Sequence, residues 1–331
     1  MQKRIALLGA LLIVLHLLPG IWVGQLRSLP LVRWLGQDRL LEQCVAIELG
    51  RIPEAQPSPE ESPVPTVSPT PSPVPTPEPT PETPVAAIAG SLDVKNRSGY
   101  EIDVAALLTE GPGLRFKPDS PQILIIHTHS SEAYTPDDFD TYESSDSSRT
   151  QDPKYNVIRV GDALTDALRG YGLEVIHDRE IYDYPSYTGS YTRSGEAVEQ
   201  YLAKYPDIAM VIDLHRDAIY HGDVVYKTMA EGQKKPCAQT MFVMGSSGSG
   251  LHHPDWQENL KLALYLQGAI YQKTPSLLRP IQLVPERYNQ HLTHGSMILE
   301  VGSNGNTLQE ALNAIELFAQ GAGPALAKLI E

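Results

Sequence analysis

The chain has 331 residues and a formal net charge of −14 at pH 7. This charge argues against a nucleic-acid partner, because phosphate recognition needs a basic surface. The length alone would allow two domains, but residues 53–85 are dominated by Pro, Glu, Ser and Thr and cannot form a core. The composition therefore predicts one large domain, at residues 86–331.

The amino-terminal end has the pattern of a membrane anchor. Residues 1–4 are basic, and residues 5–24 form an uncharged apolar run close to the ~20 residues that a spanning helix needs. A cleaved signal peptide is the rival interpretation, but its apolar region would be ~7–15 residues long and would end at an A-x-A-like site. We predict an uncleaved single-pass anchor in the cell membrane, with the basic end in the cytoplasm and the large domain on the outer face.

Two segments connect this anchor to the domain. Residues 25–52 carry apolar side chains at roughly helical spacing, which indicates a juxtamembrane segment that lies on the membrane surface or contacts a partner. Residues 53–85 are predicted to be a disordered linker. An extended proline-rich chain covers ~3 Å per residue, so this linker could hold a domain up to ~90 Å from the bilayer.

Strands and helices alternate after residue 120, which predicts an α/β fold with a mostly parallel twisted sheet and helices on both faces. The strands at 224–228 and 240–244 are expected to form a hairpin or an edge addition. Capping patterns at Asp255/Glu258 and Thr307/Glu310 are expected to open two helices. The strands are expected at 123–127, 173–177, 208–215, 224–228, 240–244, 281–284 and 297–301, and the helices at 156–171, 194–204, 255–271 and from 307 onward.

The first polar cluster directly follows the apolar strand at 123–127. His127, His129 and Glu132 lie within six residues and form a dense set of zinc-type ligands. In an extended segment His127 and His129 point the same way. Which of the three bind the metal is left open by this pattern, because all three cannot bind comfortably while also accepting a distant histidine.

Two further clusters end two other apolar strands. His215 ends one strand and is a predicted metal ligand, with Asp213 two residues earlier on the same face, where it could orient the imidazole. Alternatively, Arg216 pairs with the next residue, Asp217, and His215 only ends the strand. Glu300 ends the third strand and is the predicted catalytic acid and base, unless it pairs with an arginine.

Two weaker candidates are Arg216, which could support the site or contact substrate, and Arg287, which could bind substrate or stabilise an oxyanion. In open α/β sheets, ligands bind at the carboxyl ends of strands. We therefore expect the histidines and carboxylates of the three clusters to converge at one edge of the sheet.

Several motifs together resemble the stage II sporulation protein P family over residues 120–330. The basic start, anchor and spacer are similar too. The segments that carry the resemblance are His127-Thr-His-Ser-Ser-Glu132, Asn156-Val-Ile-Arg-Val-Gly161, Val175-Ile-His-Asp178, Asp213-Leu-His-Arg-Asp-Ala218, Arg287-Tyr-Asn-Gln-His-Leu292 and Leu299-Glu-Val-Gly-Ser-Asn-Gly-Asn-Thr-Leu308.

The resemblance implies a zinc-dependent N-acetylmuramoyl-L-alanine amidase with a single amidase-like catalytic domain. It implies His127, Glu132 and His215 as zinc ligands and Glu300 as the catalytic residue. In related amidases the acidic ligand lies near the start of the next helix, where this chain offers no Glu at 154–157. Glu132 replaces it, with His129 as the alternative ligand or as a catalytic neighbour.

The resemblance also implies a role in spore engulfment, with peptidoglycan as substrate. The implied partners are a lytic transglycosylase and a membrane protein of the engulfment machinery. Two other functions remain open from the sequence: a zinc peptidase that cuts peptidoglycan crosslinks, and a non-catalytic wall-binding protein of the same fold.

Overall fold

The computed structural model describes residues 88–142 and 148–331. The predicted cytoplasmic end, anchor, juxtamembrane segment and Pro-rich linker, at residues 1–85, all lie outside the described residues. Within those described, no helix combines the length and the apolar character needed to cross a membrane.

The described residues form a seven-stranded sheet with the order β1-β8-β7-β9-β4-β2-β3. Strands β9, β4, β2 and β3 all run parallel, and β1, β8 and β7 also run parallel to one another. The two groups join through one antiparallel pair, β7 with β9. The predicted α/β fold with a mostly parallel sheet is therefore confirmed.

The elements are β1 (Val94–Asn96), α6 (Val104–Glu110), β2 (Ile123–Ile126), α7 (Val157–Arg169), β3 (Val175–His177), α8 (Ser190–Lys204), β4 (Met210–Asp217), β5 (Tyr220–His221), β6 (Val224–Val225), β7 (Thr240–Met244), α9 (Trp256–Lys273), η1 (Pro275–Leu277), β8 (Ile281–Leu283), η2 (Gln290–Leu292), β9 (Ser296–Ser303) and α10 (Leu308–Ala327).

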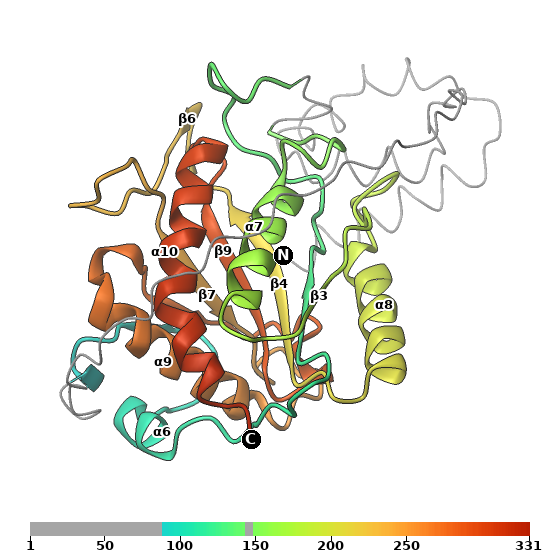
Figure 1. Ribbon diagram of the computed structural model, residues 1–331, viewed down its shortest axis with the longest axis vertical. Coiled ribbons are helices and arrows are strands. Elements are labelled where there is room, and N and C mark those ends of the chain that lie inside the picture. The colour runs from blue at the N-terminus through green and yellow to red at the C-terminus, as the bar shows by residue number, and fades with distance from the viewer. Residues whose placement is uncertain (1–87, 143–147) are drawn as a thin grey trace, which may run out of the picture. The chain divides into compact units, whose positions relative to one another are not determined.

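Alternate side chains of each strand pack on opposite faces of the sheet. In β2, Ile123 and Ile125 belong to the large core formed with α7, α9 and α10, and α7 and α10 lie side by side over this face (Figure 1). Leu124 and Ile126 belong to a second core with Val198 of α8. Helices therefore cover both faces, as predicted.

The expectation that residues 224–228 and 240–244 form a hairpin or an edge addition is wrong. Strand β7 lies inside the large sheet, between β8 and β9, while β6 pairs with β5 in a separate two-stranded sheet, near the top of Figure 1. Burial explains the difference. All five β7 side chains are buried, whereas Val224 and Val225 are exposed, so only β7 gains by being enclosed on both sides.

The two predicted capping patterns have different outcomes. At α10 the Thr307 side chain accepts from the Glu310 backbone N–H and the Glu310 side chain accepts from the Thr307 N–H, so this capping box is confirmed. Asp255 occupies the N-cap position of α9 but makes no capping hydrogen bond through its side chain. Glu258 instead pairs with Lys261 at 2.7 Å.

Helix α7 lies close to the ends of β2 and β3 because Gly161 has no side chain. A Cβ atom there would lie 2.6 Å from His177 Nε2 and 2.7 Å from His127 Nε2. Both rings are held in place, since His127 Nε2 and His177 Nε2 lie 2.8 Å apart in a hydrogen bond. Gly268 of α9 is the contrasting case, because its nearest neighbour would lie at an ordinary 3.6 Å, on Ile88.

We therefore expect opposite effects of the same substitution at two helical glycines. Gly161→Ala should lower the free energy of unfolding by about 1–2 kcal/mol, because overpacking outweighs helix propensity. Gly268→Ala should raise it by about 0.5–1 kcal/mol through propensity alone. Urea unfolding followed by circular dichroism measures both, and equal shifts in the same direction would contradict the close packing at Gly161.

Candidate functional site

A cavity of about 580 Å³ opens where β2, β4 and β9 end, within the usual size of small-molecule sites. Four of its lining side chains carry the chemistry predicted from the sequence. His129 and Glu132 come from the turn after β2, His215 comes from β4, and Glu300 comes from β9. The pairing of β4 with β9 places His215 directly opposite Glu300.

His129 lies in the turn and packs edge-on against His215, with ring centroids 5.2 Å apart. Its Nε2 lies 3.0 Å from the Tyr187 hydroxyl and its Nδ1 lies 3.3 Å from the Ser190 hydroxyl. Burial and the neighbouring His215 lower the pKa of His129 to about 4. The imidazole is therefore neutral at pH 7, which is the form that binds metals.

Glu132 is buried, and cations surround its carboxylate. Oε2 accepts from the backbone N–H of Arg216 and lies 3.3 Å from His215 Nδ1, while Oε1 lies 3.4 Å from Arg149 Nη2. Burial alone would raise the pKa of Glu132, but Arg216 and His215 outweigh it and lower the pKa to about 2. Glu132 is therefore a fixed negative charge in the site.

His215 lies between two carboxylates. Its Nε2 lies 2.9 Å from Asp213 Oδ1, although the two are poorly aligned for a hydrogen bond, and its Nδ1 faces Glu132. Burial lowers the pKa of His215, but Asp213 and Glu132 outweigh burial and hold the pKa well above its usual value. The predicted arrangement of Asp213 beside this imidazole is thus present in the structure.

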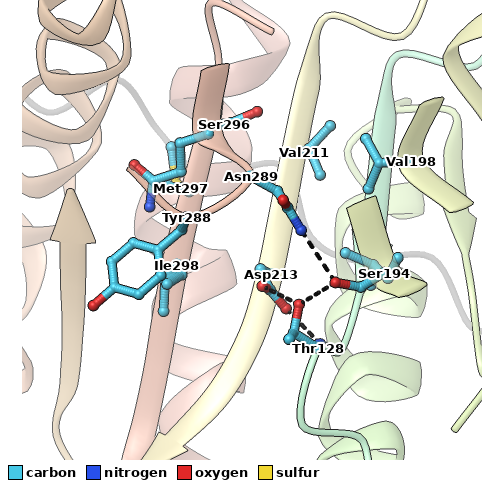
Figure 2. Close-up of a pocket in the computed structure, with 12 residues that line it drawn as sticks. Thr128, Ser194, Val198, Val211, Asp213, Tyr288, Asn289, Ser296, Met297 and Ile298 are labelled. Atoms are coloured by element: carbon cyan, nitrogen blue, oxygen red, sulfur yellow. Dashed lines mark hydrogen bonds between the residues drawn. The ribbon is translucent and has the colours of Figure 1, made fainter. Parts of the chain in front are cut away.

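A chain of hydrogen bonds fixes Asp213 from behind. Its Oδ1 accepts from the Thr128 N–H and its Oδ2 from the Thr128 hydroxyl, both at 2.7 Å. Thr128 bonds Ser194 of α8, which in turn accepts from Asn289 (Figure 2). These residues line a small pocket on the α8 side of the sheet. The turn after β2, α8 and the loop before η2 therefore all hold Asp213.

Glu300 faces the cavity, and its Oε2 atom is buried without a hydrogen-bond partner. Burial raises the pKa of Glu300 to about 8, against the opposing charge of His215. A carboxyl group with a pKa in this range can both accept and donate a proton near neutral pH. A perturbed carboxyl group in a cleft is also a common mark of a functional site.

The donor types fit a divalent metal ion. Two imidazoles and a carboxylate are zinc-type ligands, and the buried Oε2 atom of Glu300, which has no hydrogen-bond partner, belongs to a residue that lines the same cavity. Across residues 88–142 and 148–331, however, no three His, Cys, Asp or Glu side chains are grouped as they would be around a metal ion. The present contacts join the donors to protein partners, so a bound metal would replace some of these contacts.

The structure does not bring His127 to the cavity, and the expectation that His127 and His129 point the same way is wrong. The chain leaves the extended conformation at residues 128–131, where a turn closes with the Glu132 N–H donating to the His129 carbonyl. His127 instead continues the face of Ile123 and Ile125. Its Nδ1 bonds the Leu214 carbonyl at 2.9 Å and its Nε2 bonds His177.

The two arginine candidates lie in different surroundings. Arg216 is buried and does not pair with Asp217. It donates to the carbonyls of Ala133 and Ser148 and lies 3.7 Å from Glu132, so it braces the turn that carries Glu132. Arg287 is not among the cavity-lining residues and donates to the His252 carbonyl.

Two tyrosines that sequence reasoning missed line the cavity, Tyr191 of α8 and Tyr288. Their rings lie 5.4 Å apart between centroids, and Tyr288 has a positive φ of 51°, which is uncommon for a bulky residue. Its position next to Arg287 in a polar loop could have indicated a site residue, but nothing in the sequence distinguishes it from the other 15 tyrosines.

The fold and these residues define an α/β protein with an imidazole–carboxylate site at its strand ends. The chain belongs to the stage II sporulation protein P (SpoIIP) family, whose model matches residues 68–322. It is similar to the stage II sporulation protein P of Bacillus subtilis (strain 168), with 28% identity over 212 residues that make up 61% of this chain and 50% of the relative. The match thus spans about half the length of that relative.

Solved structures of amidases also align with the chain, at low identity. N-acetylmuramoyl-L-alanine amidase AmiC2 of Nostoc punctiforme aligns over 62% of this chain and 96% of its own, with 11% identity and a TM-score of 0.36. The catalytic domain of CwlV, an N-acetylmuramoyl-L-alanine amidase from Bacillus (Paenibacillus) polymyxa var. colistinus, aligns over 62% and 97%, with 12% identity and a TM-score of 0.37.

Metal binding separates the roles of the three histidines. We expect His129→Ala and His215→Ala to lose stoichiometric zinc after reconstitution, because each removes a candidate ligand from the cavity. His127→Gln should keep zinc, because both of its ring nitrogens contact the protein on the other face of the sheet. Elemental analysis of protein shown to be folded by circular dichroism measures this, and loss of zinc from His127→Gln alone would reverse the assignment.

Proposed function

We propose that this protein is a zinc-dependent N-acetylmuramoyl-L-alanine amidase, which cleaves the amide between N-acetylmuramic acid and the stem peptide of peptidoglycan. The observation that carries the proposal is the meeting of His129, Glu132, His215 and Glu300 in one cavity. Family membership supports a role in spore formation and in the cell wall. In this proposal His129, Glu132 and His215 hold the metal.

The chemistry divides between the metal and the chain. Bound zinc would polarise the amide carbonyl and make water a better nucleophile at neutral pH. Glu300 accepts the proton of the attacking water and returns it to the departing amine nitrogen of L-alanine, for which a pKa near 8 is suited. Asp213, held by Thr128, keeps the His215 ring oriented.

The cavity walls position the substrate. Tyr191 and Tyr288 present aromatic rings on the α8 side, and such rings suit the apolar faces of a sugar or a peptide. We further propose that residues 5–24 anchor the chain and that residues 53–85 give the domain reach toward the wall. The lytic transglycosylase and the membrane protein of engulfment are proposed partners on the strength of the family resemblance alone.

The central test replaces the proposed acid and base. We expect Glu300→Gln to lose about 10²- to 10⁴-fold in turnover, because an amide can neither accept nor deliver the proton, while zinc content and wall binding stay at the level of the parent. Release of soluble peptide from purified peptidoglycan measures the rate.

Glu316→Gln is the matched control, because Glu316 is an exposed residue of α10. The Glu316→Gln protein should cleave at the parent rate. Turnover of Glu300→Gln at the parent rate would show that another group moves the proton. A parent protein that binds the wall without cleaving it would support a non-catalytic role instead.

The products distinguish the amidase from a crosslink peptidase. We expect cleaved peptidoglycan to yield free stem peptides with L-alanine at their amino end, together with glycan strands that carry unsubstituted muramic acid. Mass spectrometry of the released fragments measures this. Stem peptides that remain on the glycan but lose their crosslinks would identify a peptidase with the same metal centre.

A further inference from the structure

An apolar patch extends from the site across the half of the sheet that α8 does not cover. Met241 and Val243 of β7, Val284 after β8, and Ile298 of β9 form a small buried cluster against which Tyr288 packs. The second core, which includes α8, lies instead on β2 and β4. The four patch residues line the same cavity as His215 and Glu300, so the patch and the site are continuous.

The strand register shows where this patch leads. Ile298 lies opposite Val243, Val243 lies opposite Gln282, and Gln282 lies opposite Lys95 of β1. Lys95 is therefore in the same row as Ile298, which is two residues before Glu300. Three strand spacings of ~4.8 Å and two residues of ~3.4 Å place the Lys95 backbone roughly 16 Å from that of Glu300. A fully extended peptide of five residues covers about the same distance.

The cavity has unpaired positive charge at this far end. Of its four lysine and arginine residues, Arg279 pairs with Asp217 at 2.7 Å and Arg216 lies near Glu132. Lys95 is exposed on the edge strand β1, and Arg97 is exposed directly after this strand. In the described part of the chain neither side chain has an ion-pair or hydrogen-bond partner. One exposed carboxylate, Glu286, lies on the same rim and partly offsets the two cations.

We infer that this groove binds an extended anionic peptide, with Lys95 and Arg97 contacting a carboxylate about three to five residues beyond the amide that is cleaved. The inference rests on the proposed function and gives it a specificity: long stem peptides with free carboxylates are preferred over short or amidated ones. The apolar patch and Tyr288 contact the backbone and the small side chains between the two ends. Charge complementarity selects the peptide, while Glu300 remains the group that acts on the amide.

Peptide binding can be measured without turnover in full-length Glu300→Gln protein. Isothermal titration calorimetry compares a synthetic five-residue stem peptide with the same peptide carrying amides in place of its carboxylates. We expect the free acid to bind about five- to tenfold more tightly, as two exposed ion pairs allow, and the difference to shrink as salt is raised. When Lys95→Gln and Arg97→Gln are both introduced into the Glu300→Gln protein, the difference in affinity between the two peptides should disappear.

Two matched charge changes complete the design. Lys235→Gln removes an exposed lysine that does not line the cavity and should keep the full difference. Glu286→Gln removes the opposing charge and should tighten binding of the free acid about twofold. Equal affinity for the two peptides would overturn the inference. It would also be overturned if the difference in affinity persisted after both Lys95 and Arg97 were replaced, in protein with an unchanged circular dichroism spectrum.

Cleavage by the parent protein reports separately on the proposed function. The preference for a muramoyl pentapeptide over a muramoyl dipeptide, expressed as a ratio of kcat/KM values, should fall when Lys95 and Arg97 are both replaced. If the parent cleaves no muramoyl amide while the calorimetric difference holds, the amidase assignment fails and the anionic groove stands. If cleavage is normal and no difference between the peptides is seen, the groove inference fails and the amidase stands.

Discussion

The candidate site depends on the pairing of β4 with β9. This register places His215 opposite Glu300, and both side chains point to the face that also carries Val211, Asp213 and Ile298. A shift of one residue would turn either side chain into the core on the other face. Because both strands are buried within the sheet, their apolar neighbours resist such a shift, and the apolar core thereby fixes the polar groups.

Buried charge is tolerated here because each charged group has partners on several elements. Asp213 accepts two hydrogen bonds from Thr128, and Glu132 is surrounded by Arg216, Arg149 and His215. An unpaired buried ion would be costly. Burial raises the pKa of the Glu300 carboxyl group, whose Oε2 has no such partner. Glu132 and Glu300 thus have different proton affinities because their surroundings differ, and acid–base chemistry requires such a difference.

Most of the fold and part of the site could be predicted from the sequence. Apolar runs predicted β2, β4 and β9, and Thr307 with Glu310 predicted the start of α10, because these signals are local. The three-residue strand β1 and the seven-residue helix α6 went unpredicted, since such short elements depend on tertiary packing. The position of β7 was also missed, because no local pattern indicates which strand a buried segment will pair with. Lys95 and Arg97 joined the cavity only through that pairing.

The sequence by itself determined the α/β class, the acidic overall charge, the Pro-rich composition of residues 53–85, and the presence of histidines and carboxylates at strand ends. Only the tertiary structure decided which of these side chains meet. His127 follows the phase of Ile123 and Ile125 and bonds Leu214 and His177, whereas the turn at 128–131 sends His129 and Glu132 to the opposite face. The physical reason is that strand alternation fixes relative faces within a segment, but the face that meets a distant strand is set by register and turn geometry.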